Sequence, residues 1–193
     1  MFSNLPPVIL ASGSPRRKSL LNQIGFPFTV VVSDVDEDFS LDLPPAEFAC
    51  YFAAEKARTV ASSYPGHLVI GADTIVVLKD EILGKPKNAA DSRDMLTMLS
   101  GKTHTVMTAV ALLAPQYKIE DVFMENTRVT FANLSPTEID YYIRHYTPFD
   151  KAGSYGIQDW FSVCVTRIEG CFYNVVGFPL STFYQHIKSL KFS

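Results

Sequence analysis

The chain has 193 residues, of which 47% are hydrophobic and 19% are charged, and its formal net charge is −3. A chain of this length and composition can bury a sizeable core, which excludes an intrinsically disordered protein. Binding along a nucleic-acid backbone needs a basic stripe, and the sequence has no long run of Lys or Arg. We therefore expect no nucleic-acid partner, whereas a small anionic ligand needs only a few well-placed cations.

The cysteines and the hydropathy pattern indicate the compartment. Cys50, Cys164 and Cys171 have no C-x-x-C spacing, so neither a disulfide framework nor a zinc site is predicted. Cys164 and Cys171 could meet across a hairpin, but reduced, buried thiols fit the pattern better. No apolar run reaches the roughly 18 residues of a membrane span, and the N-terminus lacks a signal-peptide pattern. We expect a cytoplasmic protein with no membrane partner.

The first structural signal is a buried strand at 8–11 that is followed at once by a helix. The residues between them are Ser12-Gly13-Ser14-Pro15-Arg16-Arg17. Ser14 suits the helix N-cap, and a proline follows it at the first helical position. The N–H groups of a helix start favour an anion, and Arg16 and Arg17 add forked donors that suit phosphate oxygens. This pattern predicts a turn that binds a polyphosphate.

A second strand is predicted at 28–32, followed by an acidic loop at 33–45 and a helix at 46–61. The acidic loop is either a solvated surface loop or a segment that returns one carboxylate, such as Glu37, to hold a metal ion. Lys56 lies near the apolar stripe of the predicted helix. Its ammonium either snorkels at the edge of that stripe or points into a cleft.

Asp73 lies inside an apolar run, which is a costly place for a lone carboxylate. A buried strand at 67–72 runs directly into Asp73 and Thr74 and continues through 75–78. The aspartate either caps a local backbone turn or acts as a catalytic base or metal ligand at the end of a strand. The sequence pattern favours neither alternative.

The remaining elements are predicted by apolar spacing and by turn residues. We expect helices at 88–99, 136–146 and 180–190, strands at 103–114 and 122–131, a loop at 148–158, and a hairpin of 163–168 with 172–176. Strands and helices intermix, but a long antiparallel pair lies in the second half. The predicted fold class is therefore α/β, a mixed twisted sheet with flanking helices, in a single domain (1–193) of two lobes around a central cleft.

The polar residues singled out so far form a chemically coherent set. Lys56 and Lys85 add cations to the opening turn, Glu37 and Asp73 can hold a divalent metal, and Gln158 offers an amide from a glycine-containing loop. Metal-assisted attack on a phosphoanhydride requires these groups, because phosphate charge must be neutralised and water must be activated.

With these residues in place, the chain from Val8 to Leu190 resembles the Maf family of nucleoside triphosphate pyrophosphatases. The resemblance rests on separated motifs that occur in the family's order: Ala11-Ser12-Gly13-Ser14-Pro15-Arg16-Arg17, Gly71-Ala72-Asp73-Thr74-Ile75-Val76, Gly84-Lys85-Pro86, Leu99-Ser100-Gly101-Lys102-Thr103-His104 with Val106-Met107-Thr108, and Asp150-Lys151-Ala152-Gly153-Ser154-Tyr155-Gly156-Ile157-Gln158.

The resemblance implies an enzyme with the Maf/ITPase-like fold that hydrolyses a nucleoside triphosphate to the monophosphate and pyrophosphate. A divalent cation such as Mg²⁺ or Mn²⁺ would be the cofactor, and the reaction would remove non-canonical or surplus nucleotides. By position, Asp73 would be the general base and would hold the metal together with Glu37. The triphosphate would be bound by Ser12, Ser14, Arg17, Lys56 and Lys85. Relatives are commonly homodimers, so a homodimer is also expected.

Arg16, Thr74 and Gln158 occupy the positions at which subfamilies differ, and this combination is similar to the branch that acts on dTTP and UTP. The amide of Gln158 can offer a donor and an acceptor to a uracil-type edge. The chain departs from the usual glycine-rich continuation with Asp159-Trp160-Phe161, which could reshape the base pocket. The alternatives are a nucleotide-binding regulator of cell division without turnover, or a pyrophosphatase for a modified nucleotide such as 7-methyl-GTP.

Overall fold

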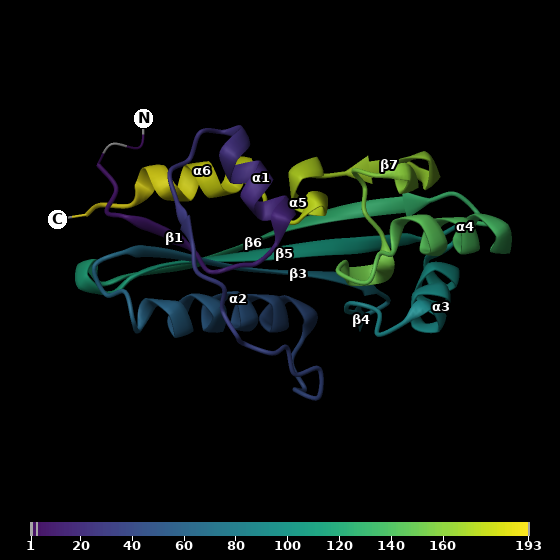
Figure 1. Cartoon of the computed structure of the whole chain (residues 1–193), viewed down its shortest axis with the longest axis horizontal. Coiled ribbons are helices and arrows are strands. Elements are labelled where there is room, and N and C mark those ends of the chain that lie inside the picture. Colours follow the sequence, from purple (N-terminus) through teal and green to yellow (C-terminus); the bar gives the residue numbers. More distant parts are fainter. Residues whose placement is uncertain (1, 3, 193) are drawn as a thin grey trace. The chain divides into compact units, whose positions relative to one another are not determined.

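A seven-stranded sheet and its flanking helices form the framework of the computed structural model, which describes residues 2 and 4–192 (Figure 1). The strands are β1 (Val8–Leu10), β2 (Thr29–Val30), β3 (Leu68–Leu78), β4 (Glu81–Leu83), β5 (Thr103–Ala114), β6 (Ile119–Phe131) and β7 (Val165–Glu169). The helices are α1 (Pro15–Gln23), α2 (Pro45–Ala61), α3 (Ala89–Leu99), α4 (Pro136–Tyr146), α5 (Phe172–Val176) and α6 (Leu180–Ser189), with short 3-10 turns η1 (Pro115–Tyr117), η2 (Ala152–Ser154) and η3 (Trp160–Cys164). None of the helices in the described part of the chain is long and apolar enough to cross a membrane.

The strand order is β2-β1-β3-β5-β6-β7, and β4 pairs with β3 outside this path. β1 pairs in parallel with both β2 and β3, whereas β3 with β4 and β6 with β7 are antiparallel pairs. The sheet is therefore mixed, and the predicted α/β fold class is confirmed.

The fold divides into two compact units. The first unit comprises the chain up to Asp73, Thr108–Glu125 and the segment from Gly177 onward, and the second comprises Thr74–Met107 and Asn126–Val176. The chain passes from one unit to the other within β3, β5 and β6, so each of these strands contributes residues to both. The predicted cleft between two lobes stays a prediction.

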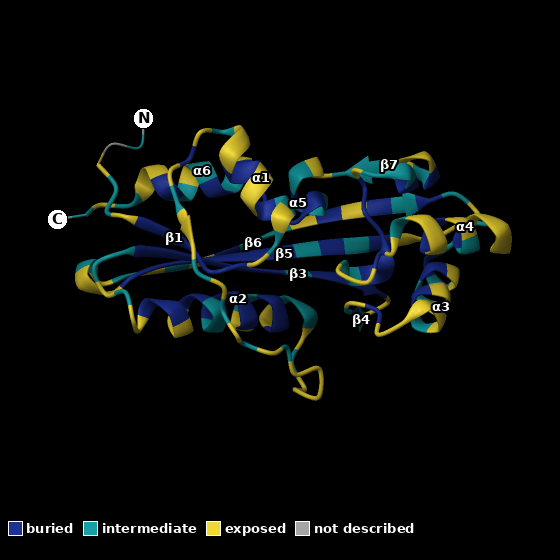
Figure 2. Cartoon of the chain, in the orientation of Figure 1, coloured by how far each residue is buried: buried dark blue, intermediate teal, exposed yellow. Residues whose placement is uncertain are grey.

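The first unit is built around buried strand residues. All three residues of β1 are buried, and so are Leu68, Val69 and Ile70 of β3. Figure 1 shows α2 along one face of this part of the sheet and α1 and α6 along the other, and Figure 2 shows that each helix turns its buried residues toward the strands. A hydrophobic stripe on each helix thus covers one side of strands that are buried on both faces.

The second unit contains α3 and α4, which contact each other. Helix α4 begins with a capping box, in which the Ser135 hydroxyl accepts from the Glu138 N–H while the Glu138 carboxylate accepts from the Ser135 N–H. The Asn88 side chain accepts from two N–H groups at the start of α3. Both helices therefore begin where the sequence predicts.

The predicted hairpin of 163–168 with 172–176 is wrong. Only 165–169 is a strand, and it pairs with β6, while Phe172–Val176 forms the short helix α5. The sequence Phe-Tyr-Asn-Val-Val has high β propensity, but tertiary packing overrides it. The amide of Asn174 is buried and donates to the Val106 carbonyl and to the Thr127 hydroxyl.

The buried face of β6 is defined by alternate residues. Val122 is exposed although it is apolar, and its neighbour Phe123 is buried. Side chains alternate between the two faces of a strand, so Phe123, Val129 and Phe131 share a face that Val122 cannot join.

Candidate active site

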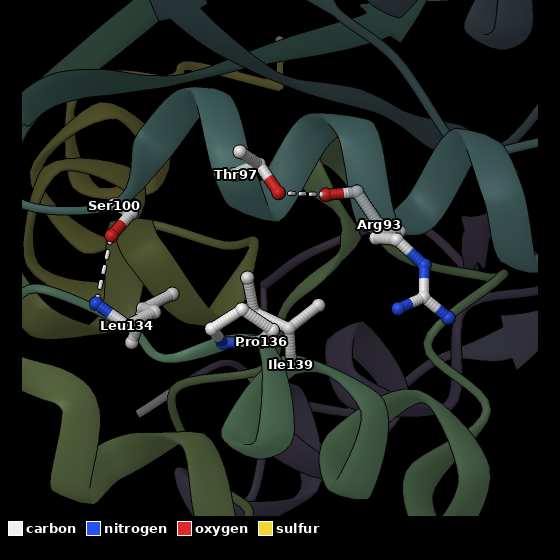
Figure 3. A pocket seen from close by; sticks show the side chains of 6 residues that line it. All are labelled: Arg93, Thr97, Ser100, Leu134, Pro136 and Ile139. Atoms are coloured by element: carbon white, nitrogen blue, oxygen red, sulfur yellow. Dashed lines mark hydrogen bonds between the residues drawn. The ribbon is translucent and has the colours of Figure 1, made fainter.

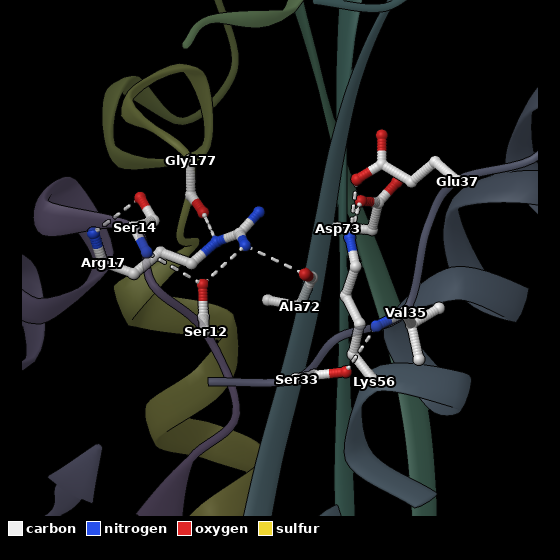
Figure 4. A network of polar contacts seen from close by, with 10 residues as sticks. All are labelled: Ser12, Ser14, Arg17, Ser33, Val35, Glu37, Lys56, Ala72, Asp73 and Gly177. Carbon is white, nitrogen blue, oxygen red and sulfur yellow. Dashed lines mark hydrogen bonds and ion pairs between the residues drawn. The ribbon is translucent and has the colours of Figure 1, made fainter. Parts of the chain in front are cut away.

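The turn that joins β1 to α1 has the local structure that its sequence predicts. Ser14 is the N-cap of α1, and its hydroxyl accepts a 3.5 Å hydrogen bond from the Arg17 N–H. Pro15 occupies the first turn of the helix. The Ser12 hydroxyl accepts from the Ser14 N–H at 3.3 Å, so the two serines brace the same turn (Figure 4).

Arg17 is buried, and its guanidinium is used to hold this turn to the rest of the first unit. Nε donates to the Gly177 carbonyl at 3.0 Å, and Nη1 donates to the Ser12 hydroxyl at 3.1 Å and to the Ala72 carbonyl at 2.9 Å. Burial lowers the pKa of Arg17, and the nearby Asp73 carboxylate opposes that shift. The side chain thus ties α1 to the residue that precedes Asp73.

Lys56 joins the two predicted metal-binding carboxylates. Its Nζ atom donates to Glu37 Oε1 and to Asp73 Oδ1, at 2.7 Å in each case. The three side chains come from the acidic loop, from α2 and from β3, and all are largely buried. The ammonium therefore points toward the carboxylates and does not snorkel to solvent, and the acidic loop does return Glu37 to Asp73 (Figure 4).

Asp73 is the most deeply buried of these groups, with 2% of its surface exposed. Burial raises its pKa, Lys56 opposes that shift, and Glu37 adds to it. Its Oδ2 atom is buried and accepts no hydrogen bond from the described residues. A carboxylate that is desolvated, paired with a cation and left with one unused oxygen has the properties of a candidate general base, not of a turn cap.

A close approach of α2 to β3 places Lys56 beside Asp73. A Cβ atom at Gly71 would lie 2.1 Å from the Ala53 carbonyl oxygen and 2.7 Å from the Ala57 nitrogen. Only glycine fits at this contact, because any side chain would push the helix away from the strand. Glycine two residues before Asp73 is therefore a structural requirement of the ion pair.

Glu37 and Asp73 are also the residues that fit a divalent cation. Among the described residues there is no group of three or more His, Cys, Asp or Glu that could hold a metal ion. Mg²⁺, however, is usually held by one or two carboxylates together with substrate phosphates and water. Two carboxylates that converge on one ammonium, with an unused oxygen on Asp73, match that donor set.

The second unit contains other residues of the predicted active site, among them Gln158 and Lys85. Gln158 is exposed in a turn, while Gly153, Ser154 and Tyr155 before it are buried. The Gly153 N–H donates to the Gly84 carbonyl at 3.0 Å, which ties this loop to the turn that carries Lys85.

β3 supports the same loop. A Cβ atom at Gly153 would lie 2.9 Å from the side chain of Val76, two residues after the half-buried Thr74. The loop of Gln158, the Gly84–Lys85 turn and the second half of β3 are therefore neighbours. Arg16 lies half-buried in α1 of the first unit.

A pocket of about 330 Å³ lies between α3 and α4 of the second unit (Figure 3). Its lining consists of Arg93, Thr97, Ser100, Leu134, Pro136 and Ile139. None of the predicted site residues is among them. Arg93 is paired with Asp140, so its charge is already balanced.

Sequence reasoning missed the carbonyl groups of Ala72 and Gly177 and the hydroxyl of Tyr142. The carbonyls accept from Arg17, and the hydroxyl binds both ends of the turn that holds Gln158. A backbone acceptor leaves no residue-type signal in a sequence. Apolar spacing at helical period accounts for the buried ring of Tyr142 but gives no indication of what its hydroxyl binds.

The chain is similar to known proteins along almost its whole length. A relative from Bacillus cereus (strain ATCC 10987 / NRS 248), "dTTP/UTP pyrophosphatase", is 48% identical over 97% of this chain and 92% of its own. A second, from Bacillus anthracis and with the same name, is 47% identical over 95% of each chain. The solved structure of the Staphylococcus aureus Ham1 protein matches 66% of this chain and 72% of its own, with 16% identity and a TM-score of 0.47. The family model "Maf-like protein" matches residues 7–190. This chain therefore belongs to the Maf-like protein family.

Proposed function

We propose that the protein hydrolyses nucleoside triphosphates, with dTTP and UTP as preferred substrates, to the monophosphate and pyrophosphate. The main structural observation in support of this proposal is the buried Asp73, which has one carboxylate oxygen paired with Lys56 and the other unused. The names of the similar proteins, at 48% and 47% identity over nearly the whole chain, support the same substrates.

In the proposed reaction, a water molecule attacks phosphorus and the anhydride between the α- and β-phosphates breaks. Asp73 takes the proton of the water at its carboxylate, and pyrophosphate leaves with the bond electrons. A raised pKa suits this role, because a base works best when its pKa approaches the working pH. Before substrate and cation bind, Lys56 holds the carboxylate in place through the 2.7 Å contact.

Glu37 and Asp73 would hold a divalent cation, Mg²⁺ or Mn²⁺. When bound, such a cation neutralises phosphate charge and orients the substrate. Lys56 is paired with the same two carboxylates in this structure. We propose that its ammonium turns to the triphosphate when the cation binds, which would assign it to both the carboxylates and the phosphates.

The triphosphate would lie at the N-terminus of α1, with Ser12, Ser14, Lys56 and Lys85 as its ligands. The helix start supplies N–H groups and a positive dipole end. Arg17 adds positive charge, but several of its donors already bind protein oxygens. Arg17 would therefore help to bind the phosphates and would also fix the shape of the turn.

The base would be recognised by Arg16, Thr74 and Gln158. Gln158 is exposed at the tip of a well-supported turn, which suits an amide that must meet a ligand. A uracil-type edge presents both a donor and an acceptor, and an amide side chain complements both. We further propose that the substrate is a free nucleotide and that the enzyme acts in the cytoplasm. The homodimer stays a prediction of the family resemblance.

The test measures pyrophosphate release from a panel of nucleoside triphosphates, with Mg²⁺ and separately with Mn²⁺. We expect dTTP and UTP to be the best substrates, and we expect Asp73→Asn to lower kcat by about 10² to 10⁴. Asp94→Asn, an exposed carboxylate on α3, is the matched control and retains activity.

Nucleotide binding without hydrolysis of any member of the panel would refute the enzyme and support a regulator. A clear preference for 7-methyl-GTP would refute the assigned substrate and leave the reaction type standing. Full activity in the presence of a chelator would refute the role of the cation.

A further inference from the structure

Gln158 lies in a tight turn that begins at Gly156 and ends at Asp159. The Asp159 N–H donates to the Gly156 carbonyl at 3.4 Å, which closes the turn around Ile157 and Gln158. Ile157 is buried and Gln158 is exposed. One central residue therefore anchors the turn in the core while the other presents its amide outward.

The hydroxyl of Tyr142 binds both ends of this turn. It accepts from the Gly156 N–H at 2.9 Å and donates to Asp159 Oδ2 at 3.0 Å. The ring of Tyr142 is fully buried in the face of α4. A hydroxyl on a buried, rotationally fixed ring can hold the two ends of a turn at a set separation.

Asp159 is fixed by a second contact. Its Oδ1 atom accepts from the Phe161 N–H at 3.0 Å, and Asp159 is thereby the N-cap of η3. Phe161 is buried against the rings of Tyr142 and Tyr155. The run Asp159-Trp160-Phe161, which departs from the family's usual continuation, thus holds the far end of the turn.

Gly156 leaves room for this arrangement. A Cβ atom there would lie 2.6 Å from Asp159 Oδ2 and 2.9 Å from the Lys151 side chain. The carboxylate can approach the Tyr142 hydroxyl only because the residue at the near end of the turn has no side chain.

We propose that Tyr142 and Asp159 are positioning residues for Gln158 and that together they set the selectivity for the nucleotide base. The inference rests on the proposed function, in which Gln158 reads the base. Neither residue has to touch the substrate, because each acts by fixing the backbone on one side of Gln158. An amide held in one orientation discriminates between bases better than one on a loose loop, since donor and acceptor must both be aligned.

The test compares Tyr142→Phe, which removes one hydroxyl and leaves the ring, with the unmodified enzyme. We expect KM for dTTP and UTP to rise about tenfold and kcat to change by less than about twofold, because binding and not chemistry loses an interaction. We expect the preference for dTTP over other triphosphates to fall by about the same factor. Asp159→Asn, which keeps an acceptor oxygen, is expected to give a smaller loss.

Tyr146→Phe is the matched control, because it removes a hydroxyl one helical turn further along α4. It is expected to leave both KM and the base preference unchanged. An unaltered base preference of the Tyr142→Phe enzyme would overturn this inference and leave the proposed function standing. The same conclusion would follow if kcat and kcat/KM fell only in proportion to the folded fraction of the variant. Failure of the unmodified protein to hydrolyse any triphosphate would overturn the proposed function and this inference with it.

Discussion

The Nζ atom of Lys56 lies 2.7 Å from Oδ1 of Asp73 and at the same distance from Oε1 of Glu37. One ammonium thus lies between two carboxylates that would otherwise repel each other in a largely buried site. Removal of the lysine would take away the cation that is hydrogen-bonded to both largely buried carboxylates, which is far more costly than the loss of an exposed ion pair.

Lys56→Met should therefore lower the free energy of unfolding by about 3 kcal/mol in the absence of divalent cations. Added Mg²⁺ should restore part of that loss, because a cation that binds only the folded state stabilises it. Urea denaturation with and without Mg²⁺ measures both effects. Arg58→Gln, which breaks the exposed pairs with Glu120 and Glu55, should cost no more than about 1 kcal/mol and should not respond to Mg²⁺. If Lys56→Met lost the same free energy of unfolding with and without Mg²⁺, the result would argue against a cation site at these carboxylates.

Arg17→Lys should lower the free energy of unfolding by about 2 to 4 kcal/mol, even though the charge is retained. A lysine cannot reproduce the fork that reaches the Gly177 carbonyl, the Ser12 hydroxyl and the Ala72 carbonyl, and the freed acceptors stay buried. Thermal unfolding of the variant measures the loss. Lys18→Ala, at an exposed position of the same helix, is the control and should lie within about 0.5 kcal/mol of the unmodified protein. Equal stability of the two variants would contradict the clamping role of Arg17.

Gly71→Ala should lower the free energy of unfolding by about 3 kcal/mol and should also reduce catalysis. The added methyl group would overlap the Ala53 carbonyl oxygen at 2.1 Å, so α2 and its Lys56 would have to move away from β3. Denaturation and pyrophosphate release on the same preparation separate the two effects. Gly66→Ala, whose Cβ would meet only the end of the Gln116 side chain at 3.3 Å, is the matched control and should change neither quantity appreciably. A stable, fully active Gly71→Ala protein would show that the close approach is not needed.

His104 should make the protein less stable as the pH falls from about 6.5 to 4. Burial lowers its pKa to about 4, and its Nε2 atom is hydrogen-bonded to the Tyr155 hydroxyl at 2.9 Å. In that pH range the unfolded chain binds a proton at this residue that the folded protein does not, so protonation favours unfolding. The contribution between pH 7 and pH 4.5 is about 2 kcal/mol, from about 1.4 kcal/mol for each pKa unit.

Unfolding free energies of the unmodified protein and of His104→Gln at these two pH values test the assignment. The variant should lose about 2 kcal/mol less than the unmodified protein on acidification. His145→Gln, an exposed histidine on α4, should behave like the unmodified protein. Parallel pH profiles for His104→Gln and the unmodified protein would disprove the contribution of His104.

Local signals in the sequence were sufficient for the elements that begin or end on a distinctive residue. The Ser14 and Ser135 caps, the prolines that follow them, and the apolar spacing of α2 and α6 identify helices because capping and one-sided burial act within a few residues. The mixed sheet followed from the order of strands and helices. The segment Phe172–Val176 was misassigned, because its β propensity is overridden by the buried hydrogen bonds of Asn174, which come from distant strands.

The sequence by itself determined which residue types carry the chemistry: carboxylates at 37 and 73, lysines at 56 and 85, and an amide at 158. Only the tertiary structure decided how they are used. It pairs Lys56 with both carboxylates, directs Arg17 to backbone carbonyls, and places the Tyr142 hydroxyl between Gly156 and Asp159. The physical reason is that these contacts join residues far apart in the chain, and their acceptors include backbone oxygens that every residue carries.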